Sequence, residues 1–116
     1  MSVIEAEPVA TTDLVDLSVL ELGRMMRSGD LSPVVLTQTC LDRIARYDGR
    51  LNSFISVCAE TALAQAKTAA RELAEGIDRG PFHGIPFALK DNVDTAGVLS
   101  SSHSKIFVDR FPTESA

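Results

Sequence analysis

The residues best suited to chemistry lie in the stretch Gly84-Ile85-Pro86-Phe87-Ala88-Leu89-Lys90-Asp91-Asn92. Residues 85–89 carry no charge, which predicts a short buried strand with Lys90 at its carboxyl end. A lysine at the rim of such a strand loses hydration, and desolvation favours the neutral amine, which is a base. Two simpler interpretations compete. Long cationic side chains commonly extend to solvent, and Asp91 or a carboxylate across the strand would hold Lys90 as an ordinary ion pair.

The histidines and cysteines give no pattern of metal ligands. His83 and His103 have no second ligand at metal spacing, and His83 is predicted to cap a loop. Cys40 and Cys58 are too few and too far apart for a metal site, and we expect two reduced, mostly buried thiols. The spacing of these residues therefore predicts no metal site.

Two helices are predicted ahead of this stretch. Residues 1–13 show no periodicity and predict a flexible tail. Ser18 and Glu21 have the spacing of a capping box, and the helix that they begin should end near Ser28-Gly29. Ser32-Pro33 is typical of a helix start and begins a second helix, which should stop around residues 47–49.

The remainder predicts an α/β fold. Leu51 to Val57 is rich in Phe, Ile and Val and predicts a strand, and an alanine-rich helix from Ala59 should end at Gly76. With the strand at Ile85 to Lys90, this order predicts a βαβ unit, in which helices pack on a small parallel or mixed sheet. Sites gather at the carboxyl ends of strands in such sheets, and Lys90 has that position.

The chain also resembles the amidase-signature family over roughly residues 14–116. The core of the resemblance is Gly-Ile-Pro, four further residues and Asp-Asn, at residues 84–92. It extends through residues 52–55, 80–86, 90–97, 101–106 and 112–114. The resemblance implies an amide hydrolase with a Ser–cis-Ser–Lys triad and with neither a metal nor an organic cofactor. Lys90 matches the catalytic lysine of the family.

One departure concerns the serines of that triad. In the family they lie on a Gly/Ser-rich segment well downstream of the lysine. Here Ser100, Ser101, Ser102 and Ser104 do not alternate with glycine, which would supply a tight turn and backbone donors. We therefore expect residues 14–116 to be the N-terminal part of an amidase domain, truncated before its serine motif. Such a chain carries Lys90 as its one triad member and should be inactive alone.

Composition limits the alternatives. The chain has 116 residues, enough for one small domain, and its 45% hydrophobic and 23% charged content is typical of a globular protein. A net charge of −5 argues against a nucleic-acid partner, and no apolar run suits a membrane span or signal peptide. We expect a cytoplasmic hydrolase of a small-molecule amide, with a homo-oligomer possible at full length. The alternatives are the glutamine-hydrolysing subunit of a tRNA-dependent amidotransferase and a non-catalytic α/β module.

Overall fold

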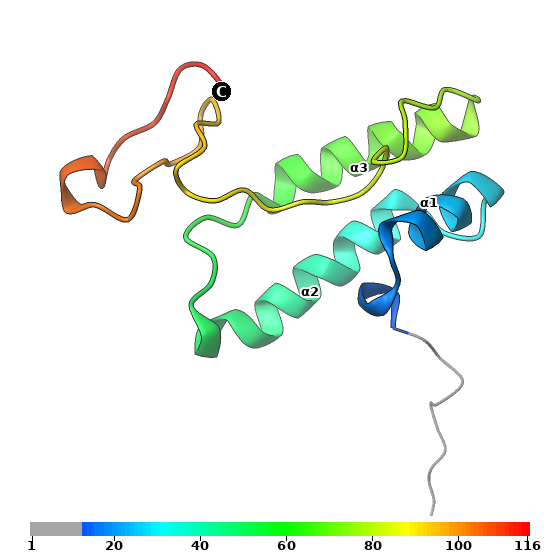
Figure 1. The fold of residues 1–116 in the computed structure, drawn as a ribbon, viewed down its shortest axis with the longest axis horizontal. Coiled ribbons are helices and arrows are strands. Elements are labelled where there is room, and N and C mark those ends of the chain that lie inside the picture. The colour runs from blue at the N-terminus through cyan, green and yellow to red at the C-terminus, as the bar shows by residue number, and fades with distance from the viewer. Residues whose placement is uncertain (1–12) are drawn as a thin grey trace, which may run out of the picture. The chain divides into compact units, whose positions relative to one another are not determined.

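The computed structural model describes residues 13–116, and three α-helices dominate it (Figure 1). The predicted flexible tail, residues 1–13, lies outside the described residues except for Asp13. That residue caps a short 3₁₀ helix, η2 (Leu14–Asp16), because its side chain accepts a hydrogen bond from the Val15 N–H. A second 3₁₀ helix, η3 (Lys105–Phe107), lies near the carboxyl end.

Helix α1 (Val19–Ser28) begins and ends where its sequence predicts. The Ser18 hydroxyl accepts from the Glu21 N–H at 3.2 Å, and the Glu21 carboxylate accepts from the Ser18 N–H at 2.8 Å, which completes the capping box. Gly29 ends the helix in the left-handed conformation, with φ of 86°. Both signals of the sequence are confirmed.

Helix α2 (Pro33–Leu51) begins at the predicted proline but continues past the predicted end at residues 47–49. The residue that takes the left-handed conformation is Asn52, with φ of 53°. The Asp48 side chain accepts hydrogen bonds from the Ser53 and Phe54 N–H groups beyond the helix, at 2.6 and 3.2 Å. These bonds favour a helix end at Leu51, because they satisfy the N–H groups of residues that follow the helix.

Helix α3 (Ala59–Ala74) is the predicted alanine-rich helix, and Gly76 follows it with φ of 84°. The two predicted strands, by contrast, are absent from residues 13–116. Residues 52–58 and 85–90 have no regular secondary structure, and Phe87 and Leu89 are exposed rather than buried. The predicted sheet and βαβ unit are therefore wrong for the described residues. An apolar run becomes a strand only when another strand satisfies its backbone groups.

The described residues divide into two compact units. The first, here called the helical unit, comprises residues 13–46 and 59–86, and the second, the loop unit, comprises Tyr47–Cys58 and Phe87–Ala116. Leu22, Met26, Leu31 and Leu36 form the core of the helical unit, and Leu73 of α3 packs against them. No helix among residues 13–116 is long and apolar enough to cross a bilayer.

Candidate functional site

Lys90 lies in the loop unit, at the end of the irregular segment that follows the helical unit. Its side chain is exposed, in agreement with the interpretation that this long cationic side chain extends to solvent. Within residues 13–116 no hydrogen bond or ion pair engages its ammonium group. Its carbonyl accepts from the Val93 N–H at 3.0 Å, which closes a turn directly after it.

Asp91 does not neutralise Lys90. One carboxylate oxygen accepts from the Ser101 hydroxyl at 2.6 Å and from the His103 N–H at 3.2 Å, and the other accepts from the Ser101 N–H at 3.2 Å. The hydrogen bond from the Ser101 hydroxyl is the main reason why the pKa of Asp91 lies below its ordinary value. Asp91 therefore ties the turn after Lys90 to the serine-rich segment.

The serines of that segment have structural partners. Ser100 and Ser101 are the buried ones, at 2% and 8% exposure. The Ser100 hydroxyl lies 3.2 Å from a carboxylate oxygen of Asp94 and 3.3 Å from the Asp91 carbonyl. The Ser104 hydroxyl accepts from the Ile106 N–H and caps η3. The three hydroxyls thus hold the local backbone, and within residues 13–116 no histidine or lysine side chain bonds to them as the base of a hydrolase nucleophile would.

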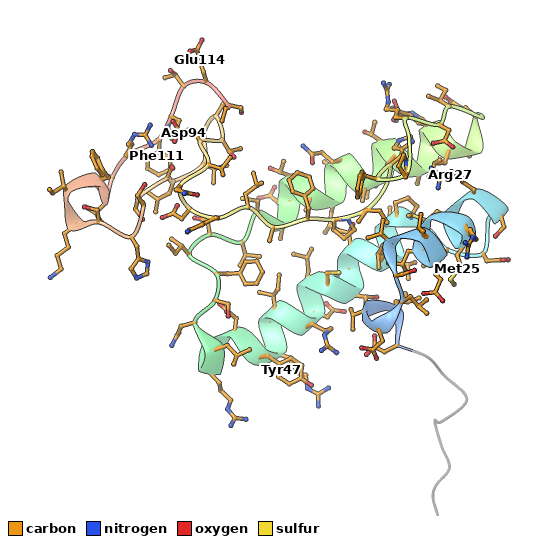
Figure 2. The ribbon with its side chains drawn as sticks, viewed as in Figure 1. Met25, Arg27, Tyr47, Asp94, Phe111 and Glu114 are labelled. Atoms are coloured by element: carbon orange, nitrogen blue, oxygen red, sulfur yellow. The ribbon has the colours of Figure 1, made fainter. Side chains whose placement is uncertain are left out.

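A bidentate ion pair joins two segments of the loop unit. Arg110 donates to both carboxylate oxygens of Asp94 (labelled in Figure 2), at 2.7 and 2.6 Å. The Arg110 carbonyl accepts from the Ser100 N–H at 2.9 Å. These bonds hold the segment around residue 100 against the chain near residue 110, and hydrogen bonds from Arg110 lower the pKa of Asp94.

The amino end of the motif is anchored in the helical unit. Gly84 has φ of 86°, and a Cβ atom there would lie 2.9 Å from the Pro33 ring and 3.0 Å from the Met26 sulfur. Ile85 packs against the hydrophobic core. Glycine is therefore required at position 84 for its backbone conformation and for close contact with α1 and α2.

Two ion-paired clusters hold the loop that leads to Gly84. Arg27, labelled in Figure 2, donates to both carboxylate oxygens of Asp78, at 2.7 and 2.9 Å, and to the Gly80 carbonyl at 2.6 Å. Hydrogen bonds from Arg27 hold the pKa of Asp78 at about 2. The last turn of α1 is thereby joined to a loop about fifty residues later.

The second cluster involves His83 and Glu72 of α3. Arg79 donates to both carboxylate oxygens of Glu72, with its shortest contact at 2.6 Å, and the His83 Nε2 lies 3.0 Å from the same carboxylate. The His83 Nδ1 accepts from the Arg79 N–H at 3.1 Å, so the ring proton lies on Nε2 and is donated to Glu72. Both ring nitrogens are thus occupied, which confirms the predicted capping role of His83.

The cysteines and acidic groups offer no metal centre within residues 13–116, where no cluster of three His, Cys, Asp or Glu ligands occurs. Both cysteines are free. Cys40 is half-buried, and burial raises the pKa of its thiol. Cys58 is exposed, so the predicted burial is wrong for this residue, because it belongs to an irregular segment rather than to a packed strand.

Comparison with known proteins identifies the family. A family model described as Amidase matches residues 35–116, which include the Gly84–Asn92 motif and Lys90. The chain therefore belongs to the amidase family, as its resemblance predicted.

Several curated relatives are subunits of one enzyme, glutamyl-tRNA(Gln) amidotransferase. The one from Thermobifida fusca is 42% identical, in an alignment that covers 82% of this chain and 19% of the relative. The one from Chromohalobacter salexigens is 48% identical, covering 78% of this chain and 18% of the relative. The chain thus spans about a fifth of the length of the curated relatives it matches.

A solved structure agrees with the fold. It was reported under "An unexpected vestigial protein complex reveals the evolutionary origins of an s-triazine catabolic enzyme". The match has a TM-score of 0.81 at 28% identity and covers 86% of this chain and 22% of that one.

The sequence motif led us to predict Lys90 as the site residue, but it gave no indication of the ion pairs that hold the surrounding loops. The ion pairs of Arg27 with Asp78 and of Arg110 with Asp94 join residues 51 and 16 positions apart. No helical or strand periodicity marks such pairs. The run of serines that begins at residue 100 marks the segment with the buried hydroxyls, but it gives no indication of their partners.

Proposed function

We propose that the chain is the lysine-bearing N-terminal part of a hydrolase that cleaves carboxamide C–N bonds, and that Lys90 is its catalytic base. Membership of the amidase family over residues 35–116 is the observation that carries this proposal. One feature of the loop unit supports it: the neighbouring carboxylate of Asp91 is engaged by Ser101 and His103 and does not pair with Lys90.

The proposed reaction uses a Ser–cis-Ser–Lys triad. The neutral Lys90 amine takes a proton from the cis-serine, which in turn takes the proton of the nucleophilic serine as that oxygen attacks the amide carbon. The C–N bond breaks, the leaving nitrogen receives a proton, and ammonia or an amine departs. Water then attacks the acyl-enzyme and releases the carboxylic acid. Both serines belong to a Gly/Ser-rich segment that residues 1–116 do not contain.

Glutamine hydrolysis within a tRNA-dependent amidotransferase is the second candidate. The names of relatives at 42% and 48% identity favour it. Glutamine is itself a carboxamide, so the same triad chemistry would release ammonia. The two candidates differ in substrate and in the need for partner subunits.

The test compares residues 1–116 with a longer chain that continues through the serine segment. We expect the longer chain to release ammonia from simple aliphatic or aromatic carboxamides, and residues 1–116 alone to release none, because the members of a triad act as a unit. Turnover of glutamine only, and only with added partner subunits, would favour the second candidate. If the longer chain turned over no amide, the remaining alternative would be a non-catalytic module.

Lys90→Ala in the longer chain tests the assigned base. We expect kcat to fall by about 10²–10⁴-fold, which is the usual contribution of a positioned proton transfer. Lys90→Arg should fail almost as severely, because a guanidinium stays protonated and accepts no proton. Lys67→Ala, which removes an exposed lysine from α3, is the matched control and should keep full activity. Full activity of Lys90→Arg would remove Lys90 from the mechanism.

A further inference from the structure

The carboxylate of Asp91 is the centre of a small, partly buried network of hydrogen bonds. It accepts two hydrogen bonds from Ser101, through the hydroxyl at 2.6 Å and the N–H at 3.2 Å, and one from the His103 N–H at 3.2 Å. Ser101 is 8% exposed. The bond from the Ser101 hydroxyl has the short length of a charge-assisted hydrogen bond, which is about twice as strong as a bond between neutral groups. Asp91 is therefore held more firmly than an exposed turn residue would be.

The backbone around these donors has a shape that is uncommon for residues with side chains. Ser102 and His103 both lie in the left-handed region, with φ of 49° and 57°. The Ser104 N–H bonds to the Ser101 carbonyl at 2.9 Å, so the chain reverses tightly at this point. Left-handed conformations cost free energy for residues other than glycine and persist where neighbouring groups stabilise them. The Asp91 carboxylate supplies that stabilisation through the His103 N–H.

The same network fixes the backbone that carries Lys90. The Lys90 carbonyl is bonded by the Val93 N–H at 3.0 Å, and the Asp91 carbonyl by the Ser100 hydroxyl at 3.3 Å. The main chain on the carboxyl side of Lys90 is thus bonded at two successive carbonyls, whereas its side chain is left unengaged within residues 13–116. This arrangement fixes the backbone of Lys90 and leaves its amine available.

We propose that Asp91 is a positioning residue for Lys90. By binding Ser101 and His103 it locks the turn after Lys90 onto residues 100–104, and so sets the point from which the lysine side chain extends. The inference rests on the proposed function, because it gives Asp91 a role only through the proton transfer of Lys90. A displacement of about 1 Å in a catalytic group can lower a rate by about 10²-fold.

The experiment uses the longer, active chain with two near-isosteric variants, Asp91→Asn and Ser101→Ala. We expect Asp91→Asn to lower kcat at least tenfold with KM within twofold, because one acceptor oxygen is replaced by a donor. Ser101→Ala should lower kcat less, by roughly threefold to tenfold, since both N–H bonds to Asp91 remain. Asp109→Asn, which removes an exposed aspartate of the same unit, is the control and should leave kcat unchanged.

A second measurement separates positioning from a general loss of structure. Each variant is acetylated briefly and digested. Mass spectrometry then gives the ratio of the acetylation rate of Lys90 to that of Lys67 in α3. We expect Asp91→Asn to raise this ratio at least threefold, because release of the turn withdraws the amine from the cis-serine that would engage it in the longer chain, while the melting temperature of the variant stays within a few degrees of the parent. A lower kcat with an unchanged ratio would overturn the inference, because Lys90 would not have moved.

The outcomes distinguish the two proposals. Loss of activity in Lys90→Ala together with kcat within threefold of the parent in Asp91→Asn overturns the positioning role alone. Full activity in Lys90→Ala overturns the proposed function, and the inference with it. A loss in both variants with a raised acetylation ratio supports both.

Discussion

Gly84, at the amino end of the motif, makes a close contact within the helical unit. Its φ of 86° and the Pro33 ring 2.9 Å from a would-be Cβ exclude larger side chains for two separate reasons. Gly29 has the same φ of 86° but nothing within 4 Å of its would-be Cβ. The two glycines therefore allow the backbone and packing costs to be separated.

Alanine at each position measures those costs. We expect Gly29→Ala to lower the free energy of unfolding by about 1–2 kcal/mol, the cost of a left-handed residue that carries a Cβ. Gly84→Ala should cost about 1–3 kcal/mol more, because the added methyl overpacks the contact with Pro33 and Met26. Urea unfolding followed by far-UV circular dichroism gives both values. Equal losses in the two variants would mean that the contact at Gly84 relaxes freely.

At the scale of elements, the loop between α3 and Gly84 is held by charge rather than by regular structure. Hydrogen bonds from Arg79, followed by the bond to His83, keep the pKa of Glu72 at about 2, against an ordinary value of 4.5. A carboxylate whose pKa is lower in the folded state stabilises the fold above its unfolded pKa. That contribution is lost as the pH falls from about 4.5 toward about 2.

Glu72→Gln tests this contribution. We expect the parent to lose stability over that acid range, and Glu72→Gln to begin less stable near neutral pH and to lose less on acidification. Thermal melts between pH 6 and pH 2 provide the comparison. Glu75→Gln, which changes an exposed glutamate just after α3, should follow the parent. An acid-induced loss as steep in Glu72→Gln as in the parent would exclude the predicted linkage.

The helices could be predicted from the sequence, whereas the predicted sheet is absent from residues 13–116. Capping signals such as Ser18 with Glu21 act within a few residues, so the sequence contains the whole interaction. A strand depends on partners elsewhere in the chain, and Ile85 to Lys90 has none among residues 13–116. The same reason applies to the candidate site: the motif predicts Lys90 as its base, a prediction that stays open, whereas the partners of Asp91 lie ten and twelve residues later in an irregular segment.

At the scale of the whole molecule, the two units differ in what they bury. All the buried hydrophobic side chains of the described residues belong to the helical unit, namely Leu22, Met26, Leu31, Leu36, Ala66 and Ala69. In the loop unit the buried residues are Ser100 and Ser101. Large apolar side chains there are exposed, including Phe87 at 79% and Ile106 at 86%.

Hydrogen exchange should follow this difference. We expect the amides of α1, α2 and α3 to exchange slowly together, and most amides of residues 87–116 to exchange at least tenfold faster, because few apolar contacts oppose local opening there. Ser101 and His103, whose N–H groups bond to Asp91, should be the slowest of that segment. Exchange measured by NMR on residues 1–116 checks both expectations. Uniform protection across both units would contradict them.

The polar interior of the loop unit also affects its response to temperature. The heat capacity of unfolding rises with the apolar surface that becomes exposed and falls with the polar surface. Opening a unit that buries Ser100 and Ser101 therefore adds little heat capacity, and the free energy of that opening varies almost linearly with temperature. The helical unit, with its leucine and methionine core, has the curved dependence of an ordinary globular protein. Cooling past the stability maximum consequently weakens the helices that anchor the motif, while the hydrogen-bonded turn beside Lys90 keeps its strength.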